Sequence, residues 1–206
     1  MTTMSSRNPM TTTTQIKWTL SCLTLLSLVA CSGSNNNTNN PPPVKTIADR
    51  LDYTNPTSGT YTLVKDTALS TSTHLVLNLM GPVGTQGTGV GFYLTADTTK
   101  VTWAKVSGGD AEYVKNGAFT LGSGTQLLKS KITTNQLQGG VFQKGTTAPA
   151  VTFTATGPLA SVALDLKSNV SLGAVTFSSI AGQAVLTNGS AAPAPIVISY
   201  GSLAAN

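Results

Sequence analysis

The chain has 206 residues, of which only 9% are charged, and this length allows one ordinary domain with a buried core. The formal net charge is +5, but Arg7 and Lys17 lie in a segment that we expect to be removed, which leaves ten basic residues against seven acidic ones. The ten are scattered singly from Lys45 to Lys167. This pattern excludes the dense basic patches typical of nucleic-acid-binding proteins.

An uncharged, mostly apolar segment of thirteen residues runs from Trp18 to Ala30 and follows Lys17. A charged start and an apolar middle are typical of a secretory signal peptide. Thirteen residues are fewer than the roughly 20 that span a bilayer as a helix, so a permanent transmembrane anchor is the weaker interpretation. A buried helix of a globular protein is a further alternative, and the polar tract that follows argues against it.

The apolar segment ends in Leu28-Val29-Ala30-Cys31, which resembles the lipobox of bacterial lipoproteins. The resemblance implies cleavage before Cys31 and attachment of diacylglycerol to its thiol, and two acyl chains suffice for stable anchoring. The other cysteine, Cys22, follows Thr19-Leu20-Ser21, a poorer match. Ser32 after the lipidated cysteine implies sorting to the outer membrane, with the domain facing either the periplasm or the exterior.

A tract rich in asparagine and proline follows the cysteine as far as Pro43. Its composition is too polar and too rich in proline to fold alone. We therefore expect three regions: a signal peptide over residues 1–30, a lipidated cysteine and flexible linker over 31–45, and one folded domain over 46–206.

Runs of apolar and β-branched residues separated by turn residues predict strands through most of the remaining chain. Alternation is clearest in His74–Met80, and Gly91–Thr95 is expected to form a hairpin with Lys100–Val106. Further strands are predicted over 60–65, 118–121, 126–132, 140–143, 159–166, 174–177, 183–187 and 196–200. No apolar run has helical spacing and no internal repeat is present, so we expect an all-β fold, a single β-sandwich of about nine strands.

The stretch Gly89–Trp103 resembles the early core of cohesin domains, although Ala96 departs from the aromatic residue often found before the family's aspartate turn. Leu159–Lys167, followed by Leu172–Phe177 and Gln183–Gly189, resembles the closing strands of the same family. The resemblance covers most of the mature domain and implies a nine-stranded jelly-roll sandwich related to carbohydrate-binding modules. Cohesins bind dockerin modules or act as surface adaptors. No dockerin-like calcium loop occurs in this chain, so the partner would be another protein.

Residues for catalysis or metal binding are sparse. His74 is the only histidine and no Gly-x-Ser-x-Gly elbow accompanies it, so we interpret it as a structural or surface histidine and predict that the protein is not an enzyme. Asp110 and Glu112 form the nearest carboxylate pair, in a glycine-containing loop where oxygen ligands could meet calcium. Solvated charges that keep a turn open are the favoured interpretation, and no cofactor is predicted apart from the covalent lipid.

Three aromatic residues close in sequence, Tyr93, Trp103 and Tyr113, are the candidates for a binding surface, because sandwich modules commonly bind sugars on exposed planar rings. Alternation places Trp103 on the same strand face as Val101, which is the arrangement of an inward tryptophan. A core position is therefore favoured for Trp103.

Together these features predict a lipid-anchored protein of the outer membrane with a non-catalytic binding or adhesion module, whose partner is an envelope or surface protein. The alternative is a carbohydrate-binding module that binds envelope glycan. An envelope hydrolase built on a pair of carboxylates is the least favoured hypothesis. The sequence leaves the partner, the leaflet orientation and the oligomeric state open.

Overall fold

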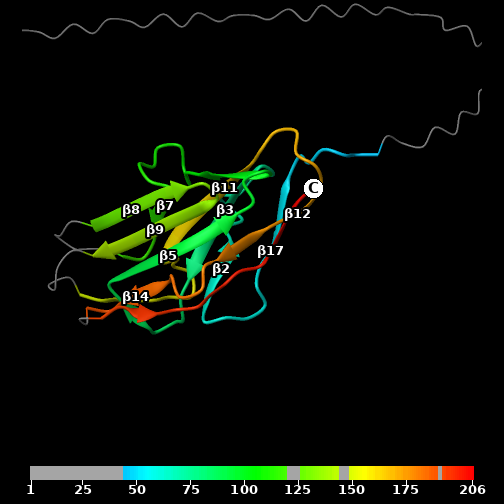
Figure 1. Ribbon diagram of the computed structural model, residues 1–206. Helices are drawn as coiled ribbons and strands as arrows, with labels where there is room; N and C mark the ends of the chain where they lie inside the picture. Colours follow the sequence, from blue (N-terminus) through cyan, green and yellow to red (C-terminus); the bar gives the residue numbers. More distant parts are fainter. Residues whose placement is uncertain (1–43, 120–125, 144–148, 190–191) are drawn as a thin grey trace, which may run out of the picture. The chain divides into compact units, whose positions relative to one another are not determined.

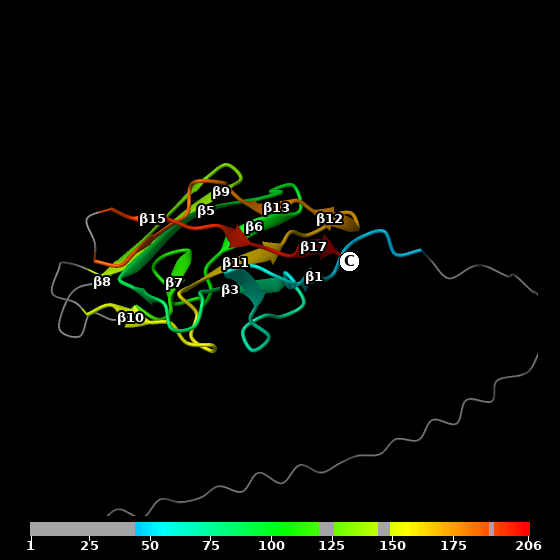
Figure 2. The ribbon, with the colours of Figure 1, turned by 90° about the horizontal axis from the view of Figure 1, so that it is seen from below.

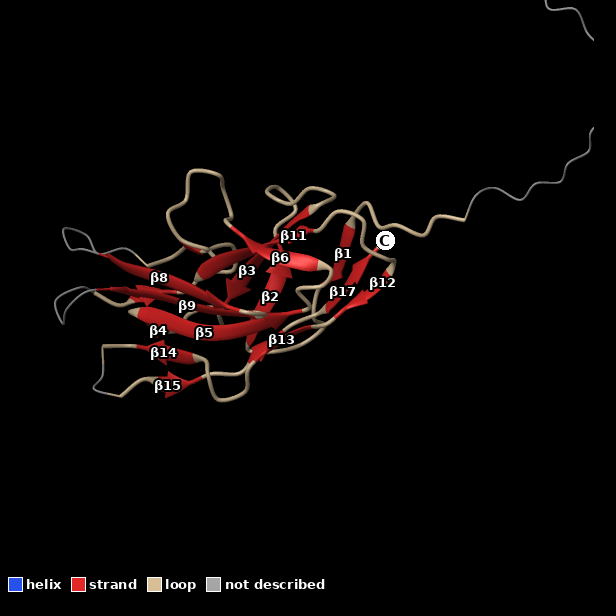
Figure 3. Cartoon of the chain, turned by 45° about the horizontal axis from the view of Figure 1, so that its top comes forward, coloured by secondary structure: helices blue, strands red, loops and turns tan. Residues whose placement is uncertain are grey.

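The computed structural model describes residues 44–119, 126–143, 149–189 and 192–206. Its compact unit spans Pro43–Asn206, so the predicted signal peptide, Cys31 and nearly all of the linker lie outside the described residues. Within the described ranges the chain forms strands and no helix (Figure 3). No segment among them is therefore a helix long and apolar enough to cross a membrane.

Two six-stranded sheets stack against each other (Figure 2), which confirms the predicted all-β sandwich. The front sheet has the order β15-β14-β5-β9-β8, with β13 also paired to β5. Its strands are β5 (Gly89–Ala96), β8 (Gln126–Thr133), β9 (Gln136–Gln143), β13 (Phe177–Ser179), β14 (Val185–Thr187) and β15 (Ala194–Pro195).

The back sheet has the order β16-β2-β3-β11-β6, with β7 also paired to β11. Its strands are β2 (Tyr61–Lys65), β3 (His74–Met80), β6 (Val101–Ala104), β7 (Val114–Asn116), β11 (Ala160–Leu166) and β16 (Ile198–Ser199). All of its pairings are antiparallel except β16 with β2.

Two smaller sheets complete the fold. The order β1-β17-β12 joins β1 (Leu51–Thr54), β17 (Ser202–Ala205) and β12 (Gly173–Val175), and a two-stranded sheet joins β4 (Gln86–Gly87) to β10 (Val151–Thr152). The N–H groups of Asp49 and Arg50 donate to the carbonyl of Asn206, whose own N–H donates to Arg50. The C-terminus therefore lies beside the start of β1 (Figure 1).

The core lies between the two large sheets and follows from the period of two along each strand. In β3, Leu75, Leu77 and Leu79 are buried, and in β5, Phe92 and Leu94 are buried, all within one hydrophobic cluster. Complete burial of a leucine or phenylalanine side chain contributes about 1.5–3 kcal/mol. These inward residues leave the alternate positions of both strands on the outer faces.

The predicted hairpin of Gly91–Thr95 with Lys100–Val106 is wrong. β5 pairs with β9 in the front sheet, whereas β6 pairs with β11 in the back sheet. The Asp97 carboxylate accepts a 2.9 Å hydrogen bond from the N–H of Thr99, and this turn carries the chain from one sheet to the other. In the front sheet, β8 and β9 form the hairpin beside β5. Its turn contains Thr134, which has a φ of 52°.

Candidate binding face

The outer face of the back sheet is partly covered by the loop after β6. Val76, Ala104 and Ala163 lie side by side on this face, and Val106 from the loop packs on them in a second buried cluster. Because burial excludes water from all four side chains, this part of the face is internal rather than a surface available to a ligand.

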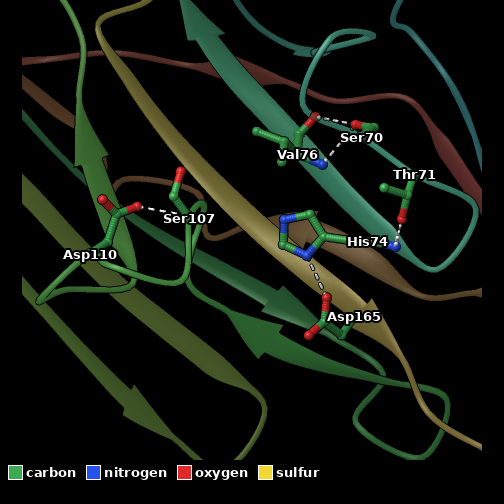
Figure 4. A network of polar contacts seen from close by, with 7 residues as sticks. All are labelled: Ser70, Thr71, His74, Val76, Ser107, Asp110 and Asp165. Atoms are coloured by element: carbon green, nitrogen blue, oxygen red, sulfur yellow. Dashed lines mark hydrogen bonds and ion pairs between the residues drawn. The ribbon is translucent and has the colours of Figure 1, made fainter. Parts of the chain in front are cut away.

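A polar pair lies on the same outer face. His74 and Asp165 are directly opposite on β3 and β11, and Nδ1 of His74 lies 2.5 Å from Oδ1 of Asp165 (Figure 4). The backbone N–H of His74 donates to the hydroxyl of Thr71. Among the described residues no serine hydroxyl is hydrogen-bonded to His74, so the pair lacks the nucleophile that a Ser-His-Asp relay needs.

Asp110 and Glu112 bind separate partners. The Asp110 carboxylate accepts a 2.8 Å hydrogen bond from the N–H of Ser107, which closes the loop (Figure 4). Glu112 accepts hydrogen bonds from both the N–H and the hydroxyl of Ser130, at 2.9 and 2.6 Å. In the part of the chain that the structure describes, no three His, Cys, Asp or Glu side chains gather as a metal site. The Asp110 carboxylate therefore stabilises the loop, and the Glu112 carboxylate binds the edge of β8.

The outer face of the front sheet is arranged as a grid of cross-strand neighbours. One row of this grid crosses β14, β5, β9 and β8. It consists of Val185, Gly91, Gly140 and Lys129, each directly opposite the next. Directly opposed residues project to the same face of an antiparallel sheet. This row therefore has side chains at its two ends and bare backbone at its centre.

Phe142 on β9 lies against this bare backbone. A Cβ atom added to Gly89, Gly91 or Gly140 would stand 2.5, 3.0 or 2.6 Å from an atom of the Phe142 ring. The ring therefore occupies the space that side chains at the three glycines would fill. Glycine within a strand marks such a close approach, and an aromatic ring laid over it restores part of the missing contact.

A hollow of about 430 Å³ opens over this row. We call it the glycine trough. It is lined by Gly91, Tyr93, Gln138, Gly140, Phe142 and Val185, with Lys129 and Lys131 at the β8 end. Tyr93, Gln138 and Lys131 form the next row of the grid and make one wall. None of the described residues that line it carries a carboxylate or an imidazole.

The three predicted aromatic residues are not brought together. Tyr93 lies on the wall of the glycine trough, whereas Trp103 is 4% exposed and inside the core. The Trp103 indole N–H donates to the carbonyl of Asn135 at 3.3 Å. Tyr113 is half-buried in the loop before β7, where its N–H donates to the hydroxyl of Ser130.

Sequence reasoning missed Phe142 and Val185, which are the apolar side chains beside Gly91 in the described part of the trough. The available signal was the recurrence of glycine within two runs that otherwise resemble strands, at Gly89, Gly91 and Gly140. Since β5 and β9 are neighbours only in the folded chain, the sequence alone did not place Gly91 opposite Gly140 or Gly89 opposite Phe142.

No protein-family model and no curated protein matches this sequence. Among solved structures, it is similar to a type II cohesin domain from the cellulosome of Acetivibrio cellulolyticus, with 9% identity and a TM-score of 0.47 over 71% of this chain and 94% of that chain. It is also similar to the sixth cohesin of scaffoldin B from Acetivibrio cellulolyticus, solved with a mutant Cel5 dockerin, with 17% identity and a TM-score of 0.45 over 70% and 97%. A chain of a CaDoc0917–CaCohA2 complex matches with 10% identity and a TM-score of 0.48 over 69% and 95%.

Proposed function

We infer that this protein is a lipid-anchored component of the cell envelope whose β-sandwich binds another protein, without catalysis, through the glycine trough. The observation that carries this proposal is the contrast between the two outer faces. The back sheet is partly covered by its own loop, whereas the front sheet has a hollow with apolar, amide and cationic groups. Sheet faces of this mixed chemistry are typical of recognition surfaces.

A non-catalytic role fits the chemistry of the trough. Hydrolysis of a glycoside or an ester needs a positioned acid, base or nucleophile. The described residues with polar side chains that line the trough are lysine, glutamine, serine and tyrosine, and none of them is acidic or a histidine. The His74–Asp165 pair lies on the other sheet.

A protein partner is favoured over a glycan. Flat sugar-binding faces commonly use several exposed planar rings in a strip. The trough has Tyr93 and Phe142, while Trp103 is in the core and Tyr113 lies in a loop. The carbohydrate-binding alternative therefore has fewer aromatic residues than it needs.

The anchor proposal depends on the lipobox at Leu28–Cys31. Intact mass of the membrane-extracted protein, measured beside a Cys31→Ala variant, tests it directly. Lipid mass on the wild type and none on the variant is the expected result. An unlipidated wild type would overturn the anchor and the outer-membrane localisation together.

Site-specific photocrosslinking tests the binding face. In the full chain expressed in its own membrane, Gln138 is replaced by a photoreactive phenylalanine analogue, and the exposed Thr102 on the back sheet is replaced in a control. We expect a discrete protein adduct from position 138 and none from position 102. Equal labelling from both positions would contradict the proposal, and an adduct with polysaccharide alone would favour the carbohydrate-binding module.

A further inference from the structure

We propose that the glycine trough takes an acidic segment of the partner protein, one that carries an apolar side chain at one end and a carboxylate about four residues away. This inference rests on the proposed function and adds the chemistry of the partner. It follows from the different character of the two ends of the trough.

The β8 end is cationic. Lys129 and Lys131 are both exposed, and the side chain of Lys129 is 84% accessible. Among the described residues, the ion pair of this end joins Lys129 to Glu112, with 4.0 Å between Nζ and Oε1, and the other oxygen of Glu112 is bound to Ser130. Lys131 has no ion pair within the described ranges. Two ammonium groups with so little local neutralisation favour a carboxylate on the ligand.

The β14 end is apolar. Val185 lies beside Gly91, and the Phe142 ring covers the glycines between the strands. Among the residues that the structure describes, no side chain with a formal charge lines this end of the trough. An aliphatic or aromatic side chain of the partner would be removed from water here at a gain of about 25 cal/mol per Å² of apolar surface.

The distance between the two ends sets the spacing in the ligand. Val185 and Lys129 are separated by three strand-to-strand steps, or about 14 Å at the usual spacing of 4.7–4.9 Å. An extended chain covers that distance in about four residues. Gln138 on the trough wall supplies an amide donor and acceptor for the intervening backbone.

A peptide matches these two ends better than a neutral sugar does. A sugar ring presents hydroxyl groups on its rim and gains little from two ammonium groups, whereas a peptide combines an apolar side chain and a carboxylate in one short segment. The charged end should also steer association, so binding should weaken with salt.

A random peptide display library panned against the full chain, purified in detergent, tests the inference. We expect the selected peptides to share an apolar residue followed three to five positions later by aspartate or glutamate. Their affinity for Lys131→Glu should be at least about fivefold lower than for the wild type. Their affinity for the wild type should also fall at least about fivefold when the salt concentration rises from about 50 to about 500 mM. Lys65→Glu on the back sheet changes the net charge equally and should leave the affinity unchanged.

Three outcomes would overturn the inference. Selected peptides without acidic residues that still lose binding to Tyr93→Ala would leave the trough as a protein-binding site and remove its acidic preference. Acidic peptides that bind the wild type and Lys131→Glu with equal affinity would also remove the acidic preference of the trough. Peptides insensitive to Tyr93→Ala, or no selected peptide at all, would count against both the inference and the proposed function.

Discussion

The phenol of Tyr53 donates a 2.9 Å hydrogen bond to the backbone carbonyl of Leu63. The same oxygen accepts a 2.7 Å bond from the N–H of Gly201, just before β17. The Tyr53 ring packs edge-on against Phe177 of the front sheet, with 6.4 Å between centroids. One side chain of β1 therefore joins the small terminal sheet to both large sheets.

Tyr53→Phe should lower the free energy of unfolding by about 1–3 kcal/mol, because it removes the hydrogen-bond partner of one half-buried N–H and one buried carbonyl. Urea denaturation measures the loss. Tyr61→Phe is the matched control, since Tyr61 is buried to a similar extent and its hydroxyl makes no hydrogen bond among the described residues. Equal losses in the two variants would show that the network contributes nothing.

Alkaline pH should destabilise the fold through the same tyrosines. Burial raises the pKa of Tyr53 above its ordinary value, against the opposing effect of the Gly201 N–H, and burial raises the pKa of Tyr61 too. The native state then keeps protons that the unfolded chain has lost. The stability that these two tyrosines contribute is therefore fully present below about pH 10 and is lost as the pH rises through their native pKa values.

Thermal unfolding, followed from pH 8 to pH 11, measures how steeply the stability falls with pH. The double variant Tyr53→Phe with Tyr61→Phe should show a shallower decline than the wild type, even though it is less stable at pH 8. An unchanged slope would mean that other groups cause the alkaline loss.

The burial of Trp103 predicts a large dependence on side-chain volume. Trp103→Ala should cost about 3–5 kcal/mol, because the indole packs at 6.3 Å from the Phe177 ring and binds the Asn135 carbonyl. Trp103→Phe keeps most of the volume and should cost less than half as much. A binding platform on the surface would instead give two folded variants of nearly wild-type stability.

The sequence predicted the strands whose buried and exposed residues alternate clearly. His74–Met80 forms β3 over the same residues, and residues 126–132 lie within β8. Most of the missed strands are short, such as β4 (Gln86–Gly87) and β10 (Val151–Thr152), two residues each. Such segments carry no period, because the strand beside them and not their own composition defines them.

The site was harder to predict than the fold. Tyr93 was identified as a binding candidate and does line the trough, but its neighbours Gln138 and Lys131 are about 40 residues away in sequence. The mistaken hairpin had the same cause. Sequential strands usually pair, yet the Asp97 turn crosses between sheets.

The glycines of β5 should differ sharply in their tolerance of a methyl group. A Cβ at Gly89 would lie 2.8 Å from the carbonyl oxygen of Val141 and 2.9 Å from Cα of Phe142, both fixed backbone atoms. At Gly91 the tightest contact is 3.0 Å from Cζ of Phe142, which a small tilt of the ring relieves.

Gly89→Ala should therefore lower stability by about 1–3 kcal/mol, as overpacking does, whereas Gly91→Ala should change it by less than about 1 kcal/mol. Chemical denaturation of the two variants side by side checks the order. The reverse order would contradict this reasoning, because the backbone beside Gly89 would then have to yield more easily than the Phe142 ring beside Gly91.

Glu112→Ala should destabilise the β8 edge by about 1–2 kcal/mol, because the N–H and hydroxyl of Ser130 lose a charged acceptor. The Ser130 hydroxyl, more than any other group, holds the pKa of Glu112 below its ordinary value. This stabilisation is present above about pH 4.5 and is lost as the pH falls through the lowered pKa. Hydrogen exchange at Ser130 reports it, with Glu112→Gln as the control that keeps one acceptor.

Glu112 also occupies part of the open edge of the front sheet. β8 is its last strand, and the outward N–H of Ser130, midway along that strand, is already bound by the carboxylate. An open sheet edge is a template on which the strand of another molecule can add. An approaching strand would have to displace a charged acceptor from the middle of the edge and present its own carbonyls to that charge. One charged side chain therefore disfavours the growth of the front sheet from one molecule into the next.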